Sequence, residues 1–263
     1  MTDFVLTEDG TSIAYDRRGD GPVIILVGGA GQFRAVDPLT RELTDLLGEG
    51  GCTAVNYDRP GRGDSGGTGP FTLAGEVNAI RALIAAHGGS ATLYGSSSGA
   101  AIALAAAAST PGVDKLLLWE VPLGPDGGTD GAEFLDDVRK AVAGGDPEAI
   151  LGTFTRDMPP EWFQGMRQGP AWPLFARMAP SVEADAEALA WTQSKPRREL
   201  WQPITVPAVV LVGSQAFPFF HDAAASIVAA LPDARRVTVE GTDHGWAATD
   251  MAGVITSCLK IEE

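Results

Sequence analysis

The sequence predicts an α/β protein built on a doubly wound, mostly parallel sheet, with a helical segment inserted after the sixth strand. Short apolar runs recur along the 263-residue chain without alternating polar residues, which is typical of parallel strands buried on both faces. Segments with apolar residues at helical spacing lie between these runs, and such alternation favours strands joined by right-handed crossovers. The alternation breaks between residues 121 and 207, where no convincing strand is predicted.

The first two strands are predicted to pair as a hairpin, and the others to follow as buried strands. Residues 4–7 and 12–15 flank Asp9-Gly10, a sequence typical of a tight turn between antiparallel strands. The buried strands are expected at residues 23–27, 52–57, 91–94, 115–119, 208–212 and 236–240. The run at 52–57 and the run at 236–240 are the less apolar of these.

Helices are predicted between the strands and throughout the insertion. The crossover helices are expected at residues 37–47, 73–87, 98–108, 223–231 and 246–259. We therefore divide the chain into a core, residues 1–120 and 205–263, and a helical cap, residues 121–204. Four tryptophans fall in the cap, and each can belong to its own hydrophobic core or face a substrate. Among them, Trp162 and Trp172 are taken as candidate substrate contacts.

Composition excludes several classes of partner. The formal net charge is −15, whereas a nucleic acid or an anionic membrane calls for clustered Lys and Arg. No apolar run reaches the roughly 18 residues needed to span a bilayer. Met1 is followed by neither a basic nor an apolar segment, so we expect no signal peptide. Two cysteines, Cys52 and Cys258, fit a reduced compartment, and we predict a cytoplasmic protein.

Residues 95–99, Gly-Ser-Ser-Ser-Gly, match the pattern G-x-S-x-G with Ser97 at the centre. The pattern follows a predicted strand and opens a predicted helix, which is the context that a nucleophile elbow requires. Such a turn strains the central residue and needs small residues two positions away, here Gly95 and Gly99. The helix start directs free N–H groups at the serine, so we expect the backbone N–H of Ser98 to bind an oxyanion. A plain Gly/Ser turn is the alternative, and the flanking elements favour the nucleophile.

A serine nucleophile needs a general base, and the chain has three histidines. His87 ends a predicted helix and is expected to act as a helix C-terminal cation. His221 is close to a strand end and is not excluded. His244 directly follows the last predicted strand, so it should lie at the same carboxyl edge of the sheet as Ser97. We predict that His244 is the base and that its neighbour Asp243 is a turn residue.

Together these features resemble the α/β-hydrolase-fold proteins over nearly the whole chain outside the cap. The resemblance is carried by VGGA at residues 27–30, DRPGRGDS at 58–65, the elbow and the late histidine. DRPGRGDS is similar to the structural D-x-x-G-x-G-x-S turn of that family, and VGGA stands where the family usually has His-Gly-x-x. The resemblance implies that the backbone N–H of Ala30 is the second oxyanion donor and that Gly29 borders the substrate.

The triad acid departs from the family pattern. The resemblance implies an Asp after the seventh strand, in G-x-x-D, but Ala216 occupies that position. Glu120 ends the sixth strand, where a carboxylate is costly unless it is paired. Some members of the fold, including certain haloalkane dehalogenases, place a Glu there. We predict that Glu120 is the triad acid. Asp222 and Glu240 are the alternative acids. Glu120 could instead be only a helix cap or a surface carboxylate.

The expected activity is that of a serine hydrolase of the carboxylic ester class. Ser97 would form an acyl-enzyme with a small, partly apolar ester, lactone or related carbonyl compound, with His244 and Glu120 completing the triad. Cofactor-free perhydrolysis or C–C bond hydrolysis on the same triad is one alternative. A ligand-binding protein with little catalysis is another, and Ala216 is its main support. We expect a small-molecule partner, no metal and no cofactor, and leave a homodimer open.

Overall fold

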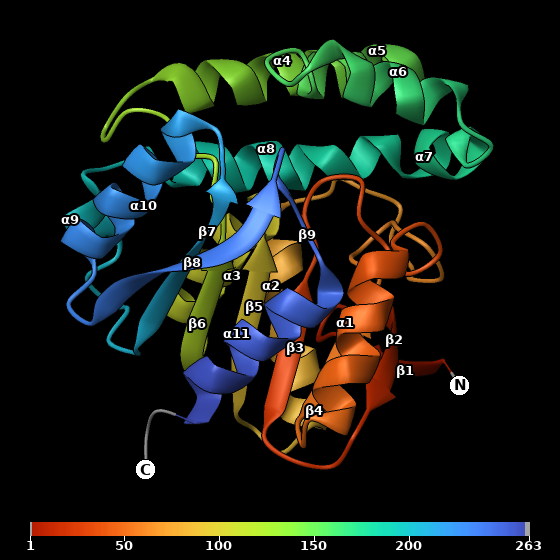
Figure 1. Ribbon diagram of the computed structural model, residues 1–263. Coiled ribbons are helices and arrows are strands. Elements are labelled where there is room, and N and C mark those ends of the chain that lie inside the picture. Colours follow the sequence, from red (N-terminus) through yellow and green to blue (C-terminus); the bar gives the residue numbers. More distant parts are fainter. Residues whose placement is uncertain (1, 261–263) are drawn as a thin grey trace.

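The computed structural model describes residues 2–260 and shows one mixed sheet. Within the described chain the strand order is β1-β2-β4-β3-β5-β6-β7-β8-β9 (Figure 1). Strands β3 to β8 pair in parallel, whereas β1, β2 and β9 join the two edges in antiparallel fashion. The strands are β1 (Asp3–Leu6), β2 (Ser12–Arg18), β3 (Val23–Val27), β4 (Thr53–Tyr57), β5 (Ala91–Ser96), β6 (Val113–Trp119), β7 (Ala208–Gln215), β8 (Ala234–Thr242) and β9 (Gly245–Trp246).

Helices cover both faces of the sheet, which confirms the doubly wound class (Figure 1). Successive side chains of a strand point to opposite faces, so β3 serves two cores. Ile24 and Leu26 pack on the side of α1 (Pro38–Glu49) and α11 (Ala248–Lys260). Ile25 and Val27 pack on the other side, where the helices are α2 (Leu73–Ala86), α3 (Ser98–Ser109) and α10 (Pro218–Ala230). Both faces being apolar explains the unbroken apolar runs of the strands.

The DRPGRGDS segment forms a tight turn after β4, as the resemblance implied. The buried carboxylate of Asp58 accepts hydrogen bonds from the backbone N–H groups of Arg34 and Asp64, at 2.8 and 2.9 Å. A Cβ on Gly63 would lie 2.1 Å from that carboxylate, so only glycine fits there. Ser65 Oγ donates to the Asp58 carbonyl oxygen and thereby closes the turn. The motif's role is therefore structural.

The cap lies between β6 and β7 and is helical. Its helices are α4 (Asp130–Gly144), α5 (Pro147–Phe154), α6 (Pro160–Gln168), α7 (Trp172–Met178), a 3₁₀ turn (Ala179–Ser181), α8 (Val182–Trp191) and α9 (Arg197–Leu200). Figure 1 shows α7 and α8 between the sheet and the layer of α4, α5 and α6. Leu135, Val138 and Val182 belong to a hydrophobic cluster that joins these layers. Several prolines of the segment stand in the first turn of a helix, where the missing N–H needs no partner.

Two helices begin at least two residues away from the predicted start. Helix α10 begins at Pro218 rather than at residue 223, so His221 and Asp222 lie inside it. Trp246 was expected to open the last helix but belongs to β9, which pairs with the end of β8. Asp243 and His244 form the turn between these strands, with φ of 50° and 67°. Positive φ is typical of a tight hairpin, but Asp-His lacks the glycine that usually signals one.

The described residues include no helix that combines the length and the apolarity needed to cross a lipid bilayer. Residue 1 and residues 261–263, which belong to the core as we divided it, lie outside the described part.

Candidate active site

Ser97 occupies a strained turn between β5 and α3. Its φ of 57° and ψ of −125° are values that residues with a side chain rarely adopt. A Cβ on Gly95 would lie 2.4 Å from Cα of Ala100, and one on Gly99 would lie 2.3 Å from the carbonyl oxygen of Val27. Both glycines are therefore needed for the strand and the helix to approach. This is the geometry expected of a nucleophile elbow.

Glu120 follows β6 and is almost completely buried, with 1% of its surface exposed. Its Oε1 accepts a hydrogen bond from the backbone N–H of Gly213 at 2.9 Å. Its Oε2 lies 2.5 Å from Nδ1 of His244. Both carboxylate oxygens thus have a partner, which offsets the cost of burying the charge.

His244 is held between aromatic rings. The ring of Phe220 stacks on the imidazole with centroids 4.7 Å apart and planes 5° apart, and Trp162 lies parallel at 6.2 Å. The indole N–H of Trp119 donates to the carbonyl oxygen of His244 at 3.3 Å. Because Glu120 engages Nδ1, the other ring nitrogen, Nε2, is left to accept a proton.

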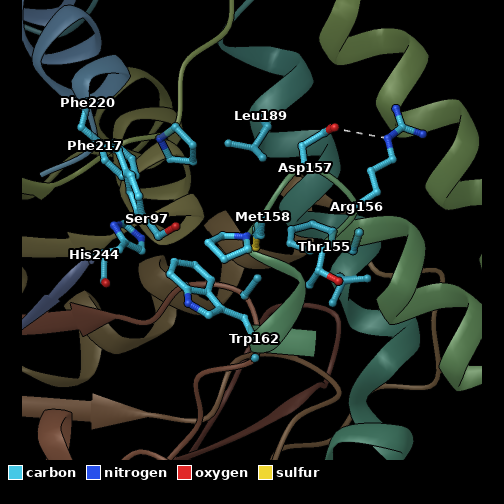
Figure 2. Close-up of a pocket in the computed structure, with 18 of the residues that line it drawn as sticks. Ser97, Thr155, Arg156, Asp157, Met158, Trp162, Leu189, Phe217, Phe220 and His244 are labelled. Carbon is cyan, nitrogen blue, oxygen red and sulfur yellow. Dashed lines mark ion pairs between the residues drawn. The ribbon is translucent and has the colours of Figure 1, made fainter. Parts of the chain in front are cut away.

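Ser97, Glu120 and His244 share positive φ values, of 57°, 40° and 67°. Each such conformation costs on the order of 1–3 kcal/mol for a residue other than glycine, and such residues cluster at functional sites. Figure 2 shows the side chains of Ser97 and His244 next to each other at one end of a cavity. Within the described residues, Ser97 Oγ makes no hydrogen bond, and catalytic contacts often shorten only when substrate binds.

The alternative acids do not reach the histidine. Asp222 is exposed on α10, and Glu240 is exposed and accepts a hydrogen bond from Ser214 Oγ at 3.0 Å. Ala216 carries no charge, and the N–H of Gly213 before it binds Glu120 instead. The geometry therefore places Glu120, rather than a residue after β7, beside the imidazole.

The other histidines lie elsewhere. His87 caps the C-terminus of α2, and its Nδ1 lies 2.8 Å from the carbonyl oxygen of Leu83. His221 lies within α10 and is absent from the residues that line the cavity. Both observations leave His244 as the histidine beside Ser97.

The two expected oxyanion donors differ in whether their backbone N–H groups already have a partner. The backbone N–H of Ser98 has no hydrogen-bond partner among residues 2–260. The N–H of Ala30, which the resemblance implied as a free donor, is bonded to Ser98 Oγ at 2.9 Å. That prediction was incomplete, because the family pattern concerns the backbone and says nothing of a hydroxyl beside the nucleophile. Gly29 does border Ser97, but its own N–H is bonded to Gln32 Oε1 at 2.6 Å.

A cavity of about 950 Å³ opens beside Ser97 between the core and the cap. Its wall includes Trp162 and the phenylalanines at the start of α10, which sequence reasoning did not assign to the site: Phe217, Phe219 and Phe220. Figure 2 shows Arg156 and Asp157 at the other end, joined by an ion pair. Trp172 does not line the cavity and packs in the hydrophobic cluster of the cap. The structure therefore gives no support to a contact between Trp172 and substrate, which stays a prediction.

The cavity wall is largely apolar, and it is acidic at its exposed rim. Asp130, Glu133 and Asp157 are exposed there, and Arg156 is the cation on the same wall. No cluster of three or more His, Cys, Asp or Glu side chains suited to a metal ion occurs within residues 2–260.

Comparisons with known proteins identify the family and the fold. The family model described as the alpha/beta hydrolase family matches residues 24–256. A solved alpha/beta hydrolase from Sphaerobacter thermophilus is 31% identical, with a TM-score of 0.81 over 98% of this chain and 100% of that one. An esterase from Exiguobacterium antarcticum (20% identity, TM-score 0.67) and an enol-lactonase from Burkholderia xenovorans (18%, 0.65) each match over 98% of both chains.

At 20% and 18% identity, the likeness to the esterase and the lactonase shows a shared fold alone. No curated protein is similar enough to count as a match. The match over residues 24–256 and the relative at 31% identity are sufficient to assign the family. The chain belongs to the alpha/beta hydrolase family.

Proposed function

We propose that the protein is a serine hydrolase that cleaves a partly apolar ester, lactone or related carbonyl compound through an acyl-enzyme. The observation that carries the proposal is the buried carboxylate of Glu120, 2.5 Å from His244 Nδ1, in a site where the imidazole lies next to a serine at a nucleophile elbow. Nucleophile, base and orienting acid have the order and the roles of a triad. The esterase and lactonase names among the structural neighbours are consistent with this chemistry.

The reaction would run in two halves. Ser97 Oγ attacks the carbonyl carbon while His244 Nε2 takes the serine proton, and Glu120 stabilises the imidazolium through Nδ1–H. The N–H of Ser98 binds the oxyanion, and the N–H of Ala30, which stays directed by Ser98 Oγ, shares its hydrogen between that oxygen and the oxyanion. His244 then gives its proton to the leaving alcohol. A water molecule that loses a proton to His244 attacks the acyl-enzyme and releases the acid.

Two features of the cavity support a substrate of this kind. Its volume of about 950 Å³ lies within the range of small-molecule sites, roughly 300–1,000 Å³, so it admits more than a short acyl group. Aromatic side chains surround the serine end, and the acidic rim disfavours a carboxylate near the entrance. A neutral ester with an apolar acyl chain of medium length fits both features.

The test is covalent labelling and turnover in parallel. The wild type is expected to react with a fluorophosphonate probe and to hydrolyse p-nitrophenyl esters of acyl chains from two to ten carbons. Ser97→Ala should abolish labelling and lower kcat by about 10⁶-fold, because the nucleophile is gone. Ser96→Ala is the matched control from the same run of serines, and it should still be labelled.

Two outcomes would contradict the proposal. A wild type that neither labels nor turns over any ester would favour a ligand-binding role. A wild type that turns over only in the presence of peroxide would favour perhydrolysis, so product analysis with and without peroxide accompanies the assay.

A further inference from the structure

A buried cluster of charges contacts Ser98, the residue after the nucleophile, and is not used by the triad. It consists of Arg59, Arg62, Glu76 and Asp185, each at most 1% exposed. Arg59 Nη1 lies 2.6 Å from Asp185 Oδ1 and its Nη2 lies 2.9 Å from Glu76 Oε1, while Arg62 Nη2 pairs with Asp185 Oδ2. Two cations and two anions balance, so this ion cluster is neutral as a whole. Asp185 joins it from α8 in the cap, whereas the arginines follow β4 in the core.

The ion cluster holds residues 28–30, the loop that carries the expected oxyanion donor. Arg59 Nη1 donates to the carbonyl oxygen of Gly28 at 3.1 Å, and Arg62 Nη1 donates to that of Gly29 at 2.8 Å. Each peptide group of this short loop is therefore tied to a fixed partner. The backbone conformation of residues 28–30 is fixed, because Asp185 holds both guanidinium groups in place.

A second connection runs through the elbow. Ser98 Oγ donates to Asp185 Oδ1 at 2.7 Å and accepts from the N–H of Ala30 at 2.9 Å. A hydroxyl has one proton, so a serine that donates to a carboxylate presents its lone pairs to other groups. An ionised Asp185 thus makes Ser98 Oγ the acceptor that fixes the direction of the Ala30 N–H.

The charge state of Asp185 supports this arrangement. Burial acts to raise the pKa of its carboxyl group, but Arg59 and Arg62 outweigh burial and leave the pKa below the ordinary value. Asp185 therefore stays ionised at neutral pH and can only accept hydrogen bonds.

We propose that Asp185 is a positioning residue for the oxyanion-binding loop, reaching residues 28–30 from the cap through Ser98, Arg59 and Arg62. It touches neither substrate nor the reacting atoms. The inference deepens the proposed function and rests on it, because it takes the Ala30 N–H as a donor to the oxyanion. A purely structural clamp between cap and core is the competing interpretation, and it predicts a loss of stability without a loss specific to the oxyanion.

The decisive variant is Ser98→Ala, which cuts the link to Ala30 and leaves the ion pairs of Asp185 in place. Losing an oxyanion donor costs about 10²–10³-fold in kcat, and misdirecting one should cost less, about tenfold. Ser98→Ala should therefore lower kcat about tenfold with KM within about twofold. Affinity for a trifluoromethyl ketone, whose carbonyl carbon bonds to Ser97 Oγ and whose oxygen becomes an oxyanion, should fall by the same factor.

Ser181→Ala is the matched control. Ser181 Oγ accepts a hydrogen bond from Arg62 Nε at 3.0 Å and has none to residues 28–30, so Ser181→Ala also removes one hydroxyl beside the ion cluster but no link to the loop. It should leave kcat and the ketone affinity at the wild-type values. Asp185→Asn should lower kcat and the ketone affinity at least as much as Ser98→Ala does. If Asp185→Asn does not fold, the result for Ser98→Ala is sufficient to decide.

Amide exchange provides a readout that needs no activity. In the wild type the Ala30 N–H should exchange slowly with solvent, measured by NMR, and Ser98→Ala should speed it at least tenfold while Ser181→Ala should not. Unchanged kcat and unchanged exchange in Ser98→Ala would overturn the proposal. A change in KM without a fall in kcat would also overturn it, as would a fall in kcat of the same size in Ser181→Ala. A wild type without esterase activity refutes the proposed function, whereas the exchange rates still decide whether Asp185 and Ser98 hold the loop.

Discussion

Two buried carboxylates, Glu120 and Asp185, serve the same site in different ways. Each is at most 1% exposed and each has both oxygens engaged. Glu120 faces one imidazole and one backbone N–H, and the imidazole borders the cavity. Asp185 faces two guanidinium groups and a hydroxyl, all of them buried.

The difference lies in what the partner can do. An imidazole gains and loses a proton near neutral pH, so a carboxylate beside it can support proton transfer. A guanidinium keeps its proton at any ordinary pH, so a carboxylate between two of them can only fix positions. A buried charge is therefore no sign of a catalytic acid until its partner and the path to the cavity are known.

The largest effect is expected from Glu120→Gln. The N–H of Gly213 should hold the amide oxygen, as it holds Oε1 now, and the amide NH₂ would then face His244 Nδ1. Nδ1 would have to accept that hydrogen bond, which puts the imidazole proton on Nε2 and removes the base. By analogy with a triad Asp→Asn change, kcat should fall up to about 10⁴-fold. Steady-state kinetics with a p-nitrophenyl ester measures this fall.

Glu240→Gln is the control for that experiment. Glu240 was an alternative acid, but it is exposed and bonded to Ser214, so its variant should keep wild-type kinetics. Full activity in Glu120→Gln, or a comparable loss in Glu240→Gln, would refute the assignment of the acid.

Asp185→Asn should cost stability instead. Removing one partner of a buried ion pair leaves charge uncompensated and typically costs about 3–5 kcal/mol. We expect a loss of this size in the free energy of unfolding in urea, because Arg59 and Arg62 would keep only Glu76 as a counter-charge. Glu183→Gln on the same helix is the control, since its partner Arg139 is 45% exposed and also pairs with Glu187, so the loss should be smaller, about 1 kcal/mol. Equal losses of unfolding free energy in the two variants would show that the buried ion pairs of Asp185 stabilise the fold no more than the pair of Glu183 does.

The parts of the site that the sequence predicts are those determined locally. The glycines around Ser97 are needed by the turn itself, and the strand before and the helix after it can be predicted from apolar spacing. Glu120 could be found because a carboxylate at the end of a buried strand demands a partner, and the edge of the sheet supplies His244.

The parts that the sequence does not predict depend on how the cap packs. Asp185 lies in a cap helix, in the stretch Val182–Trp191, and nothing nearby in sequence indicates that it meets Arg59, 126 residues away. Nothing in the sequence around Trp162 and Trp172 tells their roles apart, yet Trp162 lies against His244 and Trp172 packs in the cap's own hydrophobic cluster. The bond from Ala30 to Ser98 escaped prediction for the same reason, since it requires the loop and the elbow to be placed in space.

The smallest expected effect is a difference in how stability depends on pH. Arg59, Arg62 and Ser98 face Asp185, and Glu76 completes the charges of the cluster. Because the folded pKa of Asp185 is below the ordinary aspartate value of about 4, the unfolded chain binds more protons in that range, and stability rises with pH there. This contribution is complete above the unfolded pKa and is lost as pH falls through the folded pKa. Urea midpoints of the wild type should therefore fall more steeply below pH 4 than those of Asp185→Asn, and parallel slopes would show that Asp185 is not held ionised by its arginines.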